Sequence, residues 1–271
     1  MEKECNMPDT ELIKEINHTV GTLKFNRPER RNALSPTLLV DLHLTLKKWE
    51  AENIVRVVVI TGNSDKAFSA GYDITAIPTQ MTPEAAEILK TSNPLELALD
   101  SVKHFPFPVI AMINGYCFGA GLNLAMCCDI RIGADHIKAG MPPAKLGLVY
   151  HPEGLKQFIE VIGMAGTREI FFTAHTYEGN QLREMGLVDH LVPMNSLLET
   201  TYRMADEIAN NAPLSLLGMK KIINIIGKYP LVSSEDMKTA QKIITEAFNS
   251  DDLKEGQTAF IEKRKPIFTG K

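Results

Sequence analysis

Apolar residues recur along the chain with two different periods. An alternating pattern predicts two short strands within residues 12–26, and an unbroken β-branched run predicts a fully buried strand at 55–62. Between them, Ser35 and Pro36 precede leucines at helical spacing and predict a helix start. Further predicted elements are a helix at 83–104, a strand at 108–113, a short helix beginning near Gly119 and a strand at 128–134. This order predicts a mixed α/β core whose loops build the site at one end of the strands.

Beyond residue 154 the pattern becomes helical. Short helices are expected within 154–163, 167–174 and 178–186, a last strand within 188–193, and three or four amphipathic helices within 195–262. We therefore expect a core domain over residues 1–194 that holds the site. A C-terminal helical segment over residues 195–271 would close the site and mediate oligomerisation.

The composition is that of an ordinary globular protein. Of 271 residues, 44% are hydrophobic and 23% are charged, which suits one core domain with an appended segment. A net charge of −4 gives no basis for binding nucleic acid. The N-terminal residues are polar and acidic, without an apolar run that could act as a signal peptide or membrane anchor. We expect a cytoplasmic protein without membrane contact.

Cysteine and histidine usage gives no indication of a metal. The four cysteines lack paired ligand spacing, and the seven histidines are scattered. Cys127 and Cys128 are adjacent in an apolar stretch, so reduced core thiols are the favoured interpretation.

A glycine-rich turn within residues 114–154 is the first candidate for chemistry. Gly115, Gly119 and Gly121 allow close approach of the backbone to a ligand, and the first N–H groups of the following helix lack intrahelical acceptors. Such a turn suits a developing negative charge. The alternative is that these small residues only let a helix pack tightly on a strand.

Two motifs, AFSAGYDI at 67–74 and INGYCFGAGLNLAMCCDIRIGAD at 113–135, resemble the crotonase (enoyl-CoA hydratase/isomerase) superfamily. FNRPERRNAL at 25–34 and AFIEKRKPIF at 259–268 extend the resemblance over nearly the whole chain. The resemblance implies a spiral fold of β-β-α units with a C-terminal helical segment. It also implies an acyl-CoA thioester substrate, no cofactor beyond its coenzyme A moiety, and a homotrimer or a dimer of trimers.

The resemblance further implies which residues contact the ligand. Members of the family hold the thioester carbonyl between two backbone N–H groups, which here are those of Tyr72 and Ala120. Losing one such donor commonly raises the barrier by roughly 2.7–4 kcal/mol. The residues that would lie beside coenzyme A are Arg27, Arg30 and Arg31 at its phosphates, Ala33, Ala70 and Ile74 along the adenine and pantetheine, and Phe260 and Lys263, often from a neighbouring subunit. The alternative for the three arginines is simple solvation.

The acidic residues of hydratases are missing. Hydratases of this family use two glutamates, whose positions are occupied here by Asn123 and Pro143. An amide and a proline exchange no protons at neutral pH, so ordinary two-glutamate hydration is not expected.

Methylmalonyl-CoA decarboxylases of the same family resemble the chain better. The shared features are an FSAG-aromatic-DI motif, a proline at the second glutamate position, an LGxxY loop and an EGxxAFxEKRKPxF tail. Tyr150 matches the tyrosine that orients the substrate carboxylate. Tyr72 departs from this pattern where those enzymes carry histidine, and Asn123 departs where an acid is expected.

Three functional hypotheses remain open. Decarboxylation of a malonyl-type thioester would use Tyr150 to orient the carboxylate and His151 or a water to supply a proton. Isomerisation or hydration would use Glu153, although a carboxylate at a helix start is also favoured by the helix dipole alone. The third hypothesis is an acyl-CoA-binding protein without catalytic activity.

Overall fold

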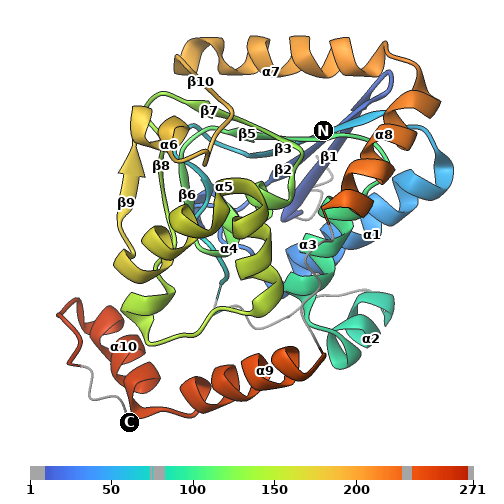
Figure 1. The fold of residues 1–271 in the computed structure, drawn as a ribbon. Helices are drawn as coiled ribbons and strands as arrows, with labels where there is room; N and C mark the ends of the chain where they lie inside the picture. The colour runs from blue at the N-terminus through green and yellow to red at the C-terminus, as the bar shows by residue number, and fades with distance from the viewer. Residues whose placement is uncertain (1–9, 74, 76–82, 228–233, 268–271) are drawn as a thin grey trace, which may run out of the picture.

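The computed structural model describes residues 10–73, 75, 83–227 and 234–267 (Figure 1). It contains a six-stranded sheet in the order β1-β2-β3-β5-β7-β10 and a four-stranded sheet in the order β4-β6-β8-β9. The larger sheet is formed by β1 (Leu12–Asn17), β2 (Val20–Phe25), β3 (Val57–Gly62), β5 (Val109–Ile113), β7 (Ile130–Ala134) and β10 (His190–Val192). The smaller sheet is formed by β4 (Ala67–Ser69), β6 (Tyr116–Phe118), β8 (Lys138–Gly140) and β9 (Thr176–Glu178). Among the strands of the described residues, only β1–β2 and β8–β9 pair antiparallel.

The chain repeats a unit of two strands and a following helical region. In β3–β4, β5–β6 and β7–β8, the first strand joins the larger sheet and the second joins the smaller one. The units lead into α2 (Pro83–Thr91) and α3 (Pro94–His104), then α4 (Ala120–Cys127), then α5 (Pro152–Thr173). The predicted spiral of β-β-α units is therefore confirmed. The strands of the smaller sheet were not predicted, because three residues are too few for an alternating pattern.

Two predicted helical boundaries were wrong. The helix expected at 83–104 is two helices, because Asn93 accepts hydrogen bonds from the N–H groups of Leu95 and Glu96 and thereby begins α3. The helices expected within 154–163 and 167–174 are joined in α5, which is kinked at Gly163 with φ 71°. The third short helix is α6 (Asn180–Glu184).

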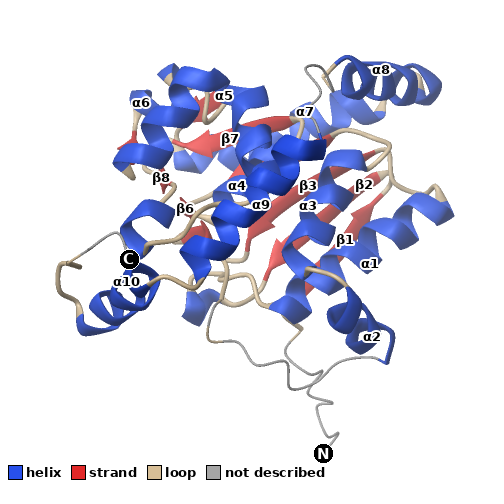
Figure 2. Cartoon of the chain, turned by 60° about the horizontal axis from the view of Figure 1, so that its bottom comes forward, coloured by secondary structure: helices blue, strands red, loops and turns tan. Residues whose placement is uncertain are grey.

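Helices cover both faces of the larger sheet. α7 (Met194–Ala209) packs against β3, β5 and β7, and Figure 1 shows it on the face opposite α1 (Pro36–Glu52), α3 and α4. Figure 2 shows α1 and α3 side by side across their face of the strands. The predicted start of α1 is confirmed, since the Ser35 hydroxyl accepts a hydrogen bond from the Leu38 N–H at 3.0 Å.

The remaining helices are α8 (Pro213–Ile226), α9 (Ser234–Phe248) and α10 (Asp251–Glu262). α9 contacts α5, and α10 packs against the 3-10 helix at Pro143–Leu146. Both lie on the side of the molecule away from α7 (Figure 1). The domain boundary at residue 194 stays a prediction. Within the described residues, none of the helices combines the length and apolar character needed to span a bilayer.

Candidate active site

Two glycine turns bring the predicted backbone donors together. Gly71 has φ +106°, and a Cβ atom on it would lie 3.1 Å from the Phe118 carbonyl oxygen and 3.6 Å from the Ala120 nitrogen. Gly119 has φ +52°, and its Cβ position lies 3.9 Å from the Gly71 Cα. Because both backbones are this close, Tyr72 and Ala120 occupy adjacent segments.

Several backbone N–H groups around these two donors are already paired. The pairs are Ala70 N–H with the Arg31 oxygen at 2.9 Å, Asp73 N–H with the Leu34 oxygen at 2.9 Å and Gly119 N–H with the Gly140 oxygen at 3.0 Å. The N–H groups of Tyr72 and Ala120 have no acceptor within the part of the chain that the structure describes. Ala120 is also the first residue of α4, where the helix dipole favours negative charge.

A chain of uncharged polar side chains links α4 to α5. The Tyr150 hydroxyl donates to Asn123 Oδ1 at 2.8 Å, and Asn123 Nδ2 donates to Gln157 Oε1. Asn123 is fully buried, and burial raises the pKa of the Tyr150 hydroxyl, so this group stays protonated at neutral pH. Gln157 was missed at the sequence level, although its position one turn after Glu153 on the same helix offered a signal.

His151 lies beside this chain and caps α5. Its ring centroid is 4.6 Å from that of Tyr150, and its Nδ1 accepts a hydrogen bond from the Gly154 N–H at 3.2 Å. Burial lowers the pKa of His151, with a smaller opposing effect from Glu153. The ring is therefore neutral near pH 7, with its proton on Nε2. That buried nitrogen has no hydrogen-bond partner among the described residues.

A cavity of about 650 Å³ opens between α3, α5 and α8. Glu153 is an exposed residue in the first turn of α5 and contributes to the lining. The lining also includes Leu99, Lys103, His151, Gln157 and Asn224. Since Gln157 bonds to Asn123, the cavity adjoins the uncharged chain.

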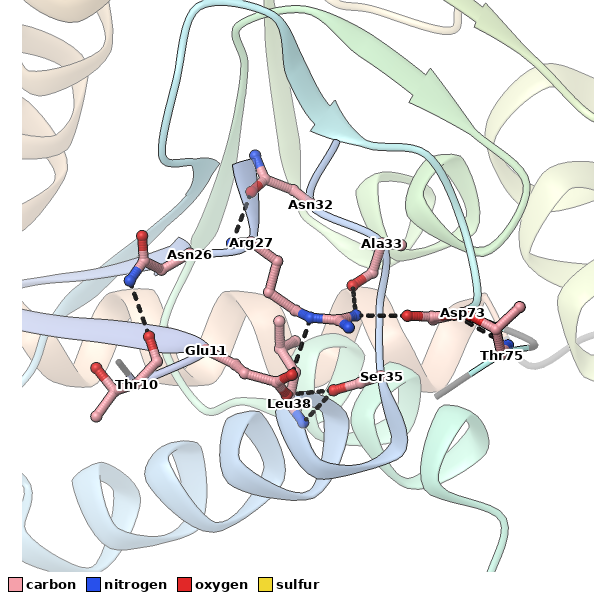
Figure 3. Close-up of polar contacts among 10 residues, drawn as sticks. All are labelled: Thr10, Glu11, Asn26, Arg27, Asn32, Ala33, Ser35, Leu38, Asp73 and Thr75. Carbon is pink, nitrogen blue, oxygen red and sulfur yellow. Dashed lines mark hydrogen bonds and ion pairs between the residues drawn. The ribbon is translucent and has the colours of Figure 1, made fainter. Parts of the chain in front are cut away.

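Arg27 does not present a free guanidinium to a phosphate. Its Nε lies 2.8 Å from Glu11 Oε1, its Nη1 lies 2.9 Å from Asp73 Oδ2, and Nη1 also donates to the Ala33 carbonyl at 2.7 Å (Figure 3). These contacts engage Nε and Nη1 within the protein, and the assignment of Arg27 to coenzyme A stays a prediction.

The other coenzyme A candidates remain predictions. Arg30, Arg31 and Ala70 are exposed, Ala33 is half-buried, and Ile74 falls outside the described residues. The Arg31 guanidinium carbon lies 5.7 Å from the ring centroid of Tyr116, a partly exposed residue that sequence reasoning missed. Phe260 is 68% exposed at the end of α10, and Lys263 follows as an exposed helix cap.

Buried thiols lie in the core rather than in a reactive site. Cys117, Cys127 and Cys128 are buried and free, and burial raises the pKa of each. In the described part of the chain, no three His, Cys, Asp or Glu residues form a group suited to a metal ion.

Known proteins resemble this chain in sequence and in fold. A family model described as enoyl-CoA hydratase/isomerase matches residues 15–271. The chain is 32% identical over 252 residues to a probable mitochondrial enoyl-CoA hydratase of Dictyostelium discoideum, covering 93% of this chain and 88% of that protein. It is 29% identical over 251 residues to the methylmalonyl-CoA decarboxylase of Escherichia coli (strain K12), covering 93% and 95%.

A solved structure of methylmalonyl-CoA decarboxylase in complex with 2-nitronate-propionyl-CoA has the same fold. The TM-score is 0.87 at 27% identity, covering 97% of this chain and 100% of that chain. The family match therefore extends through both sheets and the C-terminal helices. The chain belongs to the enoyl-CoA hydratase/isomerase family of acyl-CoA enzymes.

Proposed function

We propose that the protein decarboxylates a malonyl-type coenzyme A thioester. The observation that carries this proposal is the hydrogen-bonded chain of Tyr150, Asn123 and Gln157. Asn123, at the centre of this chain, is the residue expected at one of the two positions where hydratases of the family hold a catalytic glutamate. Decarboxylation needs no general base, because loss of carbon dioxide itself produces the enolate.

The reaction breaks the bond between the α-carbon and the carboxylate carbon. The electron pair moves toward the thioester, carbon dioxide leaves, and the N–H groups of Tyr72 and Ala120 stabilise the enolate oxygen. Tyr150 orients the departing carboxylate through its hydroxyl. Since Asn123 Oδ1 accepts a hydrogen bond from that hydroxyl, a substrate carboxylate would compete with Asn123 for this donor.

The α-carbon then takes up a proton. Because burial lowers the pKa of His151, this ring is a poor acid near pH 7. A water is therefore the proposed proton source, and the Nε2–H of His151 is the proposed hydrogen-bond donor that positions it.

Similarity to methylmalonyl-CoA decarboxylases over nearly the whole chain supports the proposal. We also propose a homotrimer or a dimer of trimers. In that assembly, exposed Phe260 and Lys263 would approach the ligand of a neighbouring subunit.

Two ligands seen in solved methylmalonyl-CoA decarboxylase complexes can test the backbone donors. In 2-nitronate-propionyl-CoA a delocalised negative charge reaches the thioester oxygen, whereas 2S-carboxypropyl-CoA has no carbonyl on the carbon bonded to sulfur. A functioning pair of N–H donors should make the nitronate bind more tightly than the thioether.

The second candidate function is enoyl-CoA isomerisation or hydration through Glu153. The observation that favours it is the position of Glu153 on the cavity beside His151 and Gln157. Curated relatives named as hydratases or isomerases also match the chain. This reaction would require Glu153 to reach the acyl carbons from the helix start.

Mass spectrometry separates the two candidates. The protein would be incubated with methylmalonyl-CoA and, separately, with crotonyl-CoA in ¹⁸O-labelled water. Loss of carbon dioxide from the first, without label in the second, is the expected result. Addition of labelled water to crotonyl-CoA while methylmalonyl-CoA stays intact would replace the proposal with hydration through Glu153. Tight binding of both esters without turnover would support a binding protein instead.

A further inference from the structure

The segment that carries Tyr72 is paired with residues 31–34 by backbone hydrogen bonds. Leu34 and Tyr72 form an isolated parallel bridge, in which the Leu34 N–H donates to the Gly71 oxygen at 2.8 Å. The Asp73 N–H returns a bond to the Leu34 oxygen at 2.9 Å. In a parallel bridge of this kind, one residue makes both hydrogen bonds, and here that residue is Leu34. The N–H of Tyr72 therefore points away from residues 31–34. The Tyr72 N–H is thus directed toward the side where Gly71 meets the start of α4.

Side chains hold the same segment from outside. The Arg27 guanidinium lies between Glu11 on one side and Asp73 with the Ala33 carbonyl on the other (Figure 3). The side chains of Arg27 and Asp73 are only 12% and 7% exposed. Screening by water is therefore weak, and the pair acts over a short distance in a fixed geometry.

Both carboxylates that flank Arg27 are anchored to further elements. Asp73 Oδ1 accepts hydrogen bonds from the Thr75 N–H at 3.0 Å and from its hydroxyl at 2.7 Å. Glu11, which precedes β1, accepts a hydrogen bond from the Ser35 hydroxyl that caps α1. Arg27 consequently connects the residue after Tyr72 to the start of a strand and the start of a helix.

We propose that Arg27 is a positioning residue, which fixes the direction of the Tyr72 N–H through its ion pair with Asp73. The bond to the Ala33 carbonyl holds the partner segment in register with the bridge. Misplacement of a reacting group by about 1 Å can lower the rate on the order of 100-fold. The inference rests on the proposed function, because the direction of this N–H matters only if a thioester oxygen binds there.

Arg27→Lys and Asp73→Asn test the inference. Lysine keeps the positive charge but cannot reproduce the fork that meets Glu11, Asp73 and the Ala33 carbonyl together. Asparagine keeps the shape of Asp73 and removes its charge. We expect kcat to fall about 10- to 100-fold in each variant, with KM changed less than about threefold.

Arg131→Lys and Asp189→Asn are matched controls. They alter another arginine ion pair, in which the buried Arg131 lies with its Nη2 2.7 Å from Oδ2 of the more exposed Asp189, between β7 and the turn before β10. We expect these controls to lose as much folding stability as Arg27→Lys and Asp73→Asn while their kcat stays unchanged. That result would separate positioning from general destabilisation.

The relative affinity for the two analogues provides a second measurement. A purely structural role of Arg27 would leave this ratio of affinities unchanged. In Arg27→Lys and Asp73→Asn, affinity for the nitronate should fall on the order of tenfold, while affinity for the thioether stays within about twofold. If Arg27→Lys fails to fold, Asp73→Asn carries the same comparison.

The outcomes distinguish the inference from the function on which it rests. If wild-type protein does not prefer the nitronate, the proposed donors are wrong and the inference falls with them. If wild-type protein prefers it and the two variants keep that preference, Arg27 does not position Tyr72 although the function stands. An equal loss of affinity for both ligands in the variants would also overturn the inference, because it indicates local unfolding.

Discussion

The two halves of the candidate site are built from different kinds of group. In one half, Tyr72 and Ala120 offer backbone N–H groups, whose direction depends on glycine conformations and on the hydrogen bonds of their neighbours. In the other half, Tyr150, Asn123 and Glu153 offer side chains, whose chemistry changes with a single substitution.

This difference explains how one family can hold several reactions. The backbone half tolerates side-chain variation, because its donors are main-chain N–H groups. In the proposed function, the backbone half binds the thioester oxygen and the side-chain half decides which reaction follows. Substitutions in the backbone half should therefore lower turnover by changing the backbone conformation, and those in the side-chain half by removing a functional group.

Gly119→Ala should have the largest effect. Gly119 has φ 52° and ψ −124°, which a residue with a Cβ atom adopts at a cost of about 1–3 kcal/mol. The neighbouring Ala120 N–H would move, and losing one such donor lowers kcat on the order of 10²- to 10³-fold. Steady-state kinetics on the substrate identified by mass spectrometry would measure this loss.

Gly179→Ala is the control for backbone strain. Gly179 precedes α6 with nearly the same angles, φ 56° and ψ −137°, but it lies next to the edge strand β9. Both variants should lose similar stability, and only Gly119→Ala should lose turnover. Equal turnover in the two variants would remove Ala120 from the backbone half of the site.

Tyr150→Phe should have the next largest effect. A hydrogen bond to a charged group contributes about 1.5–3 kcal/mol, so kcat should fall about 10- to 100-fold while coenzyme A ester binding changes little. Tyr177→Phe is the control, because it removes the hydroxyl of another tyrosine, which donates to Glu169 at 3.1 Å, away from the site. Unchanged turnover in Tyr150→Phe would exclude this hydroxyl from the side-chain half.

Asp73→Asn should alter stability in a pH-dependent way. Burial alone would raise the pKa of Asp73, but hydrogen bonds from Thr75 and the ion pair with Arg27 together hold it below its usual value. The ionised carboxylate therefore stabilises the fold above the unfolded pKa of about 4, and this contribution is lost as the pH falls through the lowered native pKa.

Urea unfolding between pH 7 and pH 3 would measure this contribution. The difference in unfolding free energy between wild type and Asp73→Asn should be largest near neutrality and shrink below about pH 4. Thr75→Val removes one hydrogen bond that lowers the pKa of Asp73. The stabilisation by the Asp73 carboxylate should then be lost at higher pH than in wild type. A difference that stays constant down to pH 3 would contradict a lowered native pKa of Asp73.

Long periodic elements and glycine motifs were predictable from the sequence, whereas side-chain partners were not. The buried run of β3 and the Ser35 cap of α1 are local features, and the structure confirms both. The ion pair of Arg27 was not predicted because its partner Glu11 precedes it by a whole hairpin, and charge alone does not reveal an ion pair. Gln157 was missed because its bond to Asn123 depends on how α5 packs on α4.

Glu153→Gln should have the smallest effect of the four. Glu153 is exposed at the start of α5, where a carboxylate is stabilised by the helix dipole without any catalytic role. Decarboxylation through the uncharged chain leaves it no proton to transfer, so kcat should stay within about twofold of wild type. Glu160→Gln, one more cavity residue on the same helix, controls for a general change in cavity charge. If Glu153→Gln loses turnover and Glu160→Gln does not, the carboxylate of Glu153 takes part in the reaction. Isomerisation or hydration would then replace decarboxylation as the reaction of the side-chain half.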